Sequence, residues 1–311
     1  MSIRSLDSVI NIYWNNPACL QKAVDKTLRK TSSDWELQGK GKLLFEQYSM
    51  FEGEGLDEKL MAEISGKGLE ADIVISTDMK LFYSRDYLLG QTQIFEDTRP
   101  WVPLKEDYHQ AVHPQGIFQP VLFVPLLIIK NKETAKDSLT VSSWQELLLP
   151  KIRKDVALSD YTKPAGKAIL DTLSYLYGRT DVEEAKNYFM IFNSPAAVFD
   201  AVDRGKASYG IVPLLFASGS GRMGQVEKVW PREGVITVIS YLAVKKSANP
   251  HLCEALLKSV LSPEMQDFYA RRGCMFPVHP QIEPNSELRE KQPALLFPSW
   301  EFILNSTEER K

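Results

Sequence analysis

Short apolar runs alternate with amphipathic stretches along most of the chain. The run 71–76 is almost entirely apolar, as in a strand covered on both faces of a sheet, whereas 56–64 repeats its apolar side chains at the spacing of one helix face. This alternation predicts an α/β fold with largely parallel sheets. The same pattern predicts strands at 9–13, 43–48, 156–159, 208–212 and 226–230, and helices from about Pro17 and at 143–148, 165–177, 182–192, 196–204, 250–261, 263–272 and 300–304.

Two long apolar runs separate the α/β blocks. The first, 117–129, is long for one strand and contains Pro120 and Pro125, so we expect two short strands with a bend between them. The second, 234–244, reads as one long strand. Two such crossings predict that one domain is inserted in another, as in a two-lobed clamshell that closes by hinge motion. The expected division is 1–121 plus 240–311 for the first lobe and 122–239 for the second.

Composition and charge exclude several classes of protein. The 311 residues carry a formal charge of −3, which argues against nucleic acid as a partner and against a polybasic membrane anchor. No apolar run approaches the ~18 residues of a membrane helix, so no membrane insertion is expected. Three cysteines and four histidines form neither a zinc pattern nor a disulfide framework, so no metal site is expected. A G-x-S-x-G elbow and a phosphate-binding P-loop are both missing.

Several segments then resemble one family, in order from about residue 9 to 280. The matches are similar to the type II periplasmic substrate-binding proteins of ABC transporters, in the group that binds ferric iron, thiamine and polyamines. No single segment is specific, but the whole series, in order and with compatible spacing, is. The segments are Gly55-Leu-Asp-Glu-Lys-Leu-Met-Ala-Glu-Ile64 with Glu70-Ala-Asp-Ile-Val-Ile-Ser-Thr-Asp78, Ser143-Trp-Gln-Glu-Leu-Leu-Leu-Pro-Lys151 with Val156-Ala-Leu-Ser-Asp160, 197–211, 231–234 with 240–250, and Leu261-Ser-Pro-Glu-Met-Gln266 with Pro277-Val278.

The resemblance implies a fold and a function. The fold would be an α/β clamshell of the type II periplasmic-binding-protein class, each lobe a mixed sheet flanked by helices and joined to the other by two crossover strands. The protein would capture a small solute between the lobes and deliver it to an ABC permease, as a non-enzymatic monomer without a cofactor. The solute would be organic, an anion or a metal chelate.

Localisation and two alternatives stay open at this point. The family is periplasmic or extracytoplasmic, but the segment after Met1 has no apolar signal region as written. If Met1 is the true start, the chain would be a cytoplasmic small-molecule sensor or scavenger on the same fold. A less favoured alternative is an enzyme on this fold.

Ligands of open α/β sheets bind at the carboxyl ends of strands, which indicates candidate residues in the first lobe. Trp14 is either a ligand contact or a core aromatic, and Glu52 either approaches a cation or lies in a solvated turn. The run 76–78 either caps the next helix or leaves backbone N–H groups for an anion. The candidates are Tyr13, Trp14, Asn15, Glu52, Ser76, Thr77 and Asp78.

The second lobe offers a helix start as its main candidate. Thr162 and Lys163 would lie where backbone donors and the helix dipole favour an anion, with ordinary capping as the alternative, and Tyr161 would form an aromatic wall. Pro213 and Glu233 complete the set. Ferric-binding relatives carry adjacent tyrosines after the strand at 208–212, but this chain reads Pro-Leu-Leu-Phe there, so a chelate or an organic ligand is expected rather than a bare metal.

Overall fold

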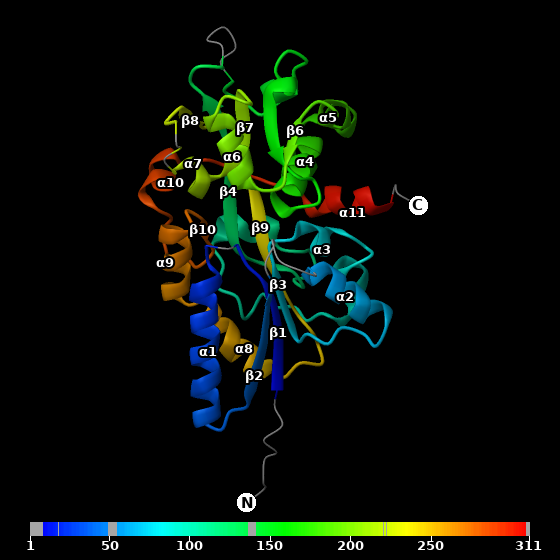
Figure 1. The fold of residues 1–311 in the computed structure, drawn as a ribbon. Helices are drawn as coiled ribbons and strands as arrows, with labels where there is room; N and C mark the ends of the chain where they lie inside the picture. The colour runs from blue at the N-terminus through cyan, green and yellow to red at the C-terminus, as the bar shows by residue number, and fades with distance from the viewer. Residues whose placement is uncertain are drawn as a thin grey trace, which may run out of the picture. The chain divides into compact units, whose positions relative to one another are not determined.

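The chain folds into two compact units (Figure 1). The computed structural model describes residues 9–308 except 18, 49–54, 136–140, 220 and 222. Unit 1 consists of Met1–Phe123, Ile239–Pro284 and Ser299–Lys311, and unit 2 of Val124–Val238 and Asn285–Pro298.

Unit 1 is built on a mixed sheet in which β1 is central among three parallel strands. β1 pairs with β2 on one side and β3 on the other, and β3 pairs antiparallel with the end of β9. The strands β1, β2 and β3 therefore finish at the same edge of the sheet. Their bounds are Val9–Asn15 for β1, Lys42–Tyr48 for β2, Ile73–Ser76 for β3 and Val235–Val244 for β9.

Helices cover both faces of this sheet (Figure 1). The chain moves from β1 to β2 through α1 and from β2 back past β1 to β3 through α2, so right-handed crossovers place the two helices on opposite faces. α1 buries a stripe at helical spacing formed by Val24, Leu28, Thr31 and Trp35. The helices of unit 1 are α1 (Gln21–Leu37), α2 (Leu56–Ser65), α3 (Met79–Tyr83), α8 (Pro250–Val260), α9 (Pro263–Arg272) and α11 (Trp300–Glu308), with 3-10 segments at Leu88–Ile94 and Glu106–Ala111.

An aromatic cluster closes the core of unit 1 around Trp300. The Trp300 ring lies 4.7 Å from the ring of His113 and 5.4 Å from that of Tyr83. Its Nε1 donates a hydrogen bond of 2.9 Å to the carbonyl oxygen of Ala111, which also accepts from the Tyr241 hydroxyl. The C-terminal helix α11 is thereby fixed to residues almost 200 positions earlier in the chain.

Unit 2 repeats this arrangement of parallel and antiparallel strands. β5 pairs in parallel with β6 and β7, and β7 pairs antiparallel with β4. Its strands are β4 (Gln119–Asn131, shared with unit 1), β5 (Val156–Ser159), β6 (Met190–Phe192), β7 (Tyr209–Pro213), β8 (Val226–Val229) and β11 (Leu295–Leu296), and its helices are α4 (Pro164–Tyr177), α5 (Arg179–Lys186), α6 (Pro195–Asp203), α7 (Leu214–Ala217) and α10 (Ser286–Lys291).

The expected bend at 117–129 is wrong, because β4 is one strand of 13 residues. Its prolines are tolerated because its partners change along its length. Phe123 and Leu122 pair with β10 (Phe276–Pro277), whereas pairing with β7 begins only at Leu126. Pro125 lies between the two ladders, and the division between the units falls beside it.

Two of the helices predicted for the second lobe also differ from the structure. The predicted helix 182–192 is α5 followed by the short strand β6, which pairs with β5 through Ala157 and Met190. The predicted helix 143–148 is a 3-10 turn over Gln145–Leu148. At 190–192, pairing with the otherwise free edge of β5 outweighs the helical pattern of the sequence.

The segment 285–298 packs with unit 2, whereas the sequence placed it with the first lobe. β11 pairs in parallel with β9 at Val235 and Ile236, and the Val235 N–H donates to the carbonyl oxygen of Ala294 at 2.8 Å. Leu288 of α10 is 1% exposed. This segment was misplaced because its partners are 50 to 60 residues earlier in the chain.

Candidate functional site

The strand ends of unit 1 bring several predicted residues together. Asn15 lies beside Tyr48 of β2 and Ser76 of β3 in register, at the carboxyl edge of the three parallel strands. Trp14 and Thr77 are each 2% exposed. Glu52, also predicted here, lies outside the described residues.

Three amide side chains at this edge carry buried polar atoms. Asn15 Oδ1, both side-chain polar atoms of Asn16, and Gln47 Nε2 have no hydrogen-bond partner within the described part of the chain. Asn15 and Asn16 are 7% and 1% exposed. A buried polar atom without a hydrogen-bond partner lowers the stability of the fold by about 1–3 kcal/mol. We therefore expect a ligand or a water molecule to form the missing hydrogen bond with each of these atoms. We refer to Asn15, Asn16 and Gln47 as the strand-end amides.

The Tyr13 side chain contacts two residues of unit 1, an acid and a cation. Its hydroxyl donates to Glu63 Oε1 at 2.7 Å, and the Lys59 ammonium lies 4.3 Å from the centre of its ring. Burial and the hydrogen bond to Glu63 raise the pKa of Tyr13 to about 12. The Tyr13 hydroxyl is therefore a neutral group that anchors α2 to β1.

The run 76–78 caps a helix. Ser76 Oγ accepts from the Asp78 N–H, and Asp78 Oδ1 accepts from the Lys80 N–H, both at 2.9 Å, at the start of α3. The structure therefore has the first of the two predicted roles, capping of the next helix. The capping atom belongs to the Asp78 carboxylate and not to a Ser or Thr hydroxyl. Ser76 and Thr77 nevertheless lie at the same sheet edge as the strand-end amides.

In unit 2, the turn between β5 and α4 positions three predicted residues. The backbone N–H and the hydroxyl of Thr162 both donate to Asp160 Oδ1 at 2.8 Å, and these bonds lower the pKa of the Asp160 carboxyl. The Tyr161 hydroxyl donates to the Lys186 carbonyl oxygen at 3.0 Å, and burial raises its pKa to about 12. Asp160 is thus satisfied within the turn, and Tyr161 by the last residue of α5.

The start of α4 itself is left open. Lys163 is the N-cap residue and its side chain makes no capping hydrogen bond, as far as the described residues extend. Pro164 at the first position has no N–H, so Ala165 and Gly166 carry the first-turn donors that a helix leaves without an intrahelical acceptor. Ser159, which precedes this turn, is fully buried, and its Oγ has no partner among the residues placed in the structure. Backbone donors and the helix dipole at such a start favour a negative group.

Pro213 ends β7 and serves as the N-cap of the short helix α7. β7 is parallel to β5, so Pro213 lies at the same edge of the sheet as Ser159. Leu214, the next residue, is fully buried. The side chains that follow β7 are therefore apolar at the place where ferric-binding relatives were expected to carry tyrosines.

Glu233 is not brought together with the other predicted residues. Its Oε1 accepts a 3.0 Å hydrogen bond from the Tyr177 hydroxyl at the last residue of α4. A helix of 14 residues is about 20 Å long, so Glu233 and the group 161–163 lie at opposite ends of α4. Its other carboxylate oxygen is buried and has no partner in the described chain.

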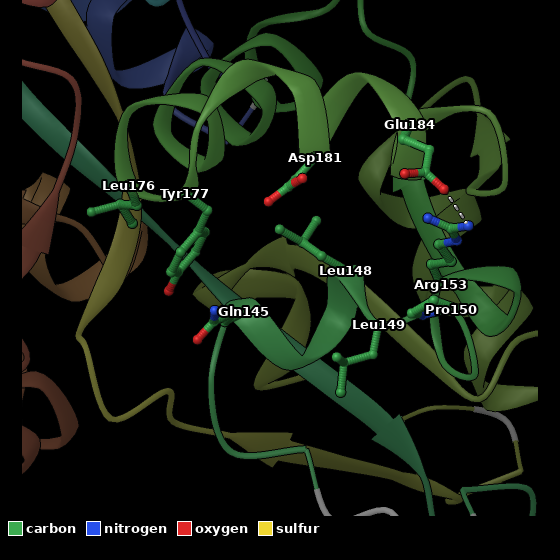
Figure 2. Close-up of a pocket in the computed structure, with 9 residues that line it drawn as sticks. All are labelled: Gln145, Leu148, Leu149, Pro150, Arg153, Leu176, Tyr177, Asp181 and Glu184. Carbon is green, nitrogen blue, oxygen red and sulfur yellow. Dashed lines mark hydrogen bonds and ion pairs between the residues drawn. The ribbon is translucent and has the colours of Figure 1, made fainter.

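Tyr177 also lines a surface pocket of unit 2 with a volume of about 470 Å³ (Figure 2). Leu148 and Asp181 point into this pocket. On the side of the pocket opposite Tyr177, the Arg153 guanidinium forms an ion pair of 2.9 Å with Glu184. Arg153 is further held over the ring of Tyr188. The pocket mixes acidic, basic and apolar groups and lies beside Glu233, apart from the start of α4.

The sequence missed Asn16 and Gln47. Asn16 follows the predicted Asn15 directly, so its position after the first strand was an available signal. Gln47 pairs in register with Trp14 on the neighbouring strand, which becomes apparent only from the sheet. Within the described residues, no group of three His, Cys, Asp or Glu side chains is arranged to hold a metal ion, and no helix is long and apolar enough to cross a membrane.

Comparisons with known proteins agree with this architecture. A family model described as bacterial extracellular solute-binding protein matches residues 70–306. Among curated protein sequences, none matches the chain.

Solved structures of similar fold cover nearly the whole chain at low identity. Apo FutA2 from Synechocystis PCC6803 has a TM-score of 0.71 at 15% identity, covering 97% of this chain and 96% of its own. The ferric binding protein from Campylobacter jejuni gives 0.70 at 15% identity, with 96% of each chain covered. Iron-bound HitA from Pseudomonas aeruginosa gives 0.68 at 13% identity, covering 95% of this chain and 92% of its own. The shared architecture is the two-lobed fold of periplasmic binding proteins.

Proposed function

The chain belongs to the family of bacterial extracellular solute-binding proteins, and from that membership we propose that it carries a polar organic anion, free or within a metal chelate, to an ABC permease. We further propose that it does so outside the cytoplasm, as a monomer that returns its solute unchanged.

The observation that carries this proposal is the set of strand-end amides in unit 1. They offer both unsatisfied donors and unsatisfied acceptors, Asn16 on both of its side-chain atoms. A bare cation would use only the acceptors, and an inorganic anion only the donors. A solute with hydroxyl or amide groups as well as oxygen acceptors satisfies the whole set.

The start of α4 in unit 2 supports a negative charge on that solute. Its first-turn N–H groups are not capped by Lys163, and the neighbouring Asp160 carboxylate is already occupied by Thr162. A carboxylate of the solute would accept from Ala165 and Gly166. This is the role predicted for the region of Thr162 and Lys163, with the backbone N–H groups of Ala165 and Gly166, beyond Pro164, making the contact.

Iron enters this proposal only inside a chelate. HitA is iron-bound in its own structure, but in this chain the residues after β7 are Leu214 and Leu215, which have no phenolate to offer. A hard ferric ion prefers anionic oxygen ligands. A ferric complex of an organic acid would present carboxylate and hydroxyl groups to the protein instead.

Replacing Asn16 by Leu tests whether the strand-end amides serve a solute or the fold. Removing an unsatisfied buried amide in favour of an apolar side chain of similar size leaves stability unchanged or raises it. The same change removes both hydrogen bonds to the solute, and we expect affinity to fall at least tenfold. The measurements are the thermal midpoint of the unliganded protein and the dissociation constant by calorimetry.

Asn131→Leu is the matched control. Asn131 is 2% exposed, but its Nδ2 donates to the Val202 carbonyl oxygen at 2.7 Å and its Oδ1 accepts from the Glu133 and Thr134 N–H groups. This variant should lose several degrees in thermal midpoint while its affinity for the solute is kept. If Asn16→Leu is destabilised to the same extent, the amide serves the fold and the proposed contact is wrong.

The solute class is tested by thermal shift with hydroxycarboxylates, their ferric chelates, free ferric ion supplied from a weak chelator, and polyamines. A ligand that binds only the folded protein raises its thermal midpoint by mass action. We expect a shift from the organic anions or their chelates, and recovery of the same compound after denaturation. A shift from polyamines alone, or conversion of the compound, would contradict the proposal.

A further inference from the structure

Two cysteines that are far apart in sequence lie at the ends of neighbouring helices in unit 1. Cys19 precedes α1 and is exposed, and Cys274 follows the end of α9 and is half-buried. The third cysteine, Cys253, is fully buried in α8. All three carry thiols in this structure.

The contacts of α1 place its start next to the end of α9. Thr31 Oγ1 lies 2.9 Å from Ser259 Oγ, and four residues earlier Thr27 Oγ1 lies 3.1 Å from Met265 Sδ. As the residue number falls along α1, the number of the contacted residue rises from 259 to 265, so the two segments run antiparallel. Figure 1 displays α1 and α9 next to each other.

The helical rise brings the two helix ends to the same level. α1 begins at Gln21, six residues before Thr27, and α9 ends at Arg272, seven residues after Met265, which correspond to roughly 9 Å and 10 Å along the two helices. Cys19 and Cys274 each lie two residues beyond these helix ends. The electrostatics agree. Residue 19 is exposed as a whole, but partial burial of its sulfur raises the pKa of the Cys19 thiol, and a charge on Cys274 raises that pKa further.

The backbone at Cys274 is also unusual. Its φ is +51°, in the left-handed region that is unfavourable for a residue with a β-carbon. Glycine is the usual residue at this position after a helix end. Here the glycine is one residue earlier, at Gly273, where a β-carbon would lie 2.8 Å from the Tyr269 carbonyl oxygen. A cysteine at such a strained position indicates a use for its side chain.

We propose that Cys19 and Cys274 form a disulfide under oxidising conditions, joining the start of α1 to the end of α9. The Cys19 thiolate attacks a disulfide oxidant, such as oxidised glutathione or a protein dithiol oxidase, and releases one thiol from it. The Cys274 thiolate then attacks the Cys19 sulfur and releases the second thiol. The two cysteines lose two electrons and two protons in total, and the oxidant is reduced to two thiols.

This bond would join the two parts of unit 1 that the inserted residues 124–238 separate in sequence. The loop that it closes contains that whole insertion, so the unfolded chain would lose much of its freedom. Cys253 takes no part, because its thiol is buried and burial raises its pKa to about 12, which keeps it from forming a thiolate.

The test uses the full chain, reduced and then incubated with oxidised glutathione. Thiols that can be alkylated after denaturation should fall from three to one in the native sequence and from two to none in Cys253→Ser. Peptide mapping should recover a linked pair containing residues 19 and 274. Oxidation should raise the thermal midpoint by several degrees in both proteins.

Cys19→Ser and Cys274→Gly should show neither the linked pair nor the rise in thermal midpoint. The glycine variant relieves the left-handed backbone, so its folding is not at risk. A glutathione adduct that persists on Cys19, a dimer linked between chains, or three thiols remaining after oxidation would each overturn the proposal.

Discussion

Buried amide side chains in this protein fall into two groups. Gln266 donates to the Val121 carbonyl oxygen at 3.0 Å and accepts from the Val278 N–H at 2.7 Å, so its burial is compensated within unit 1. Asn16 is buried to the same degree, but neither of its side-chain polar atoms has a partner among the described residues. The first kind holds segments together, and the second lowers stability until another molecule completes it.

A buried histidine makes the stability of unit 1 depend on pH. His113 is 5% exposed, its Nδ1 accepts from the Gln115 N–H at 3.2 Å, and burial lowers its pKa to about 4. The unfolded chain binds this proton near pH 6.5, so the contribution of His113 to stability is complete above that pH and is lost as pH falls towards 4. We expect a loss of roughly 3 kcal/mol over this range.

His113→Asn keeps an acceptor for Gln115 but cannot titrate. Hydrogen exchange of unit 1 peptides between pH 7 and pH 4.5 should give a smaller loss of unfolding free energy in this variant than in the native sequence. His251→Asn, at an exposed position of α8, is the control and should keep the native slope. Equal slopes in all three proteins would mean that His113 is not the group responsible.

The strand-end positions could be predicted from sequence, but their chemistry could not. Asn15 was reached from the rule that ligands bind after the carboxyl ends of strands. Whether an amide is satisfied depends on tertiary neighbours, which is why Asn131 and Asn16 look alike in the sequence. Glu233 was grouped with 161–163 in the prediction, but the sequence does not show the distance between them. Glu233 is bonded to Tyr177 at the end of α4, whereas 161–163 lie at its start.

The junction of β5 and α4 is the element on which the proposed anion contact depends. α4 approaches the end of β5 so closely that a β-carbon on Gly166 would lie 2.2 Å from the Asp160 carbonyl oxygen and 2.5 Å from that of Ser159. Both are backbone atoms, which cannot rotate away as a side chain would. The absence of a side chain at residue 166 therefore fixes where the first turn of α4 begins.

Gly166→Ala should displace the start of α4 and destabilise unit 2 by about 1–3 kcal/mol, the range for overpacking. It should also weaken solute binding, because the first-turn donors move. Lys167→Ala on the same helix removes only an ion pair with Asp171, worth about 0.3–0.5 kcal/mol, and serves as the control. Urea unfolding and calorimetry with the solute measure the two effects, and unchanged binding in Gly166→Ala would remove α4 from the proposed contacts.

Long elements with clear periodicity were predicted well, and short ones were not. The helices at 165–177 and 263–272 match α4 and α9 to within one residue. β6, β10 and β11 have three residues or fewer, too short for a period, and they exist only because a longer strand offers them an edge. β4 differs from expectation because the effect of its prolines depends on which partner each stretch pairs with.

At the scale of the whole molecule, the chain passes between its two units four times. After the main insertion it returns to unit 1, then contributes 285–298 to unit 2, and finally places Trp300 in the core of unit 1. The residues 285–308 therefore stabilise both units by separate contacts. In unit 2 these are the β11–β9 pairing, the buried Leu288, and the ion pair of Lys228 with Glu287.

Two truncations should separate these contributions. A chain ending at residue 298 loses Trp300, whose deletion from a packed core costs about 3–5 kcal/mol, but keeps every contact of 285–298. Hydrogen exchange should then increase in unit 1 peptides around Ala111 and Tyr241 and stay unchanged in β9 at Val235 and Ile236. A chain ending at residue 284 should increase exchange in both places, because Val235 also loses its bond to Ala294. Equal loosening of both units by the shorter deletion would contradict this division, since it would mean that α11 supports unit 2 as well.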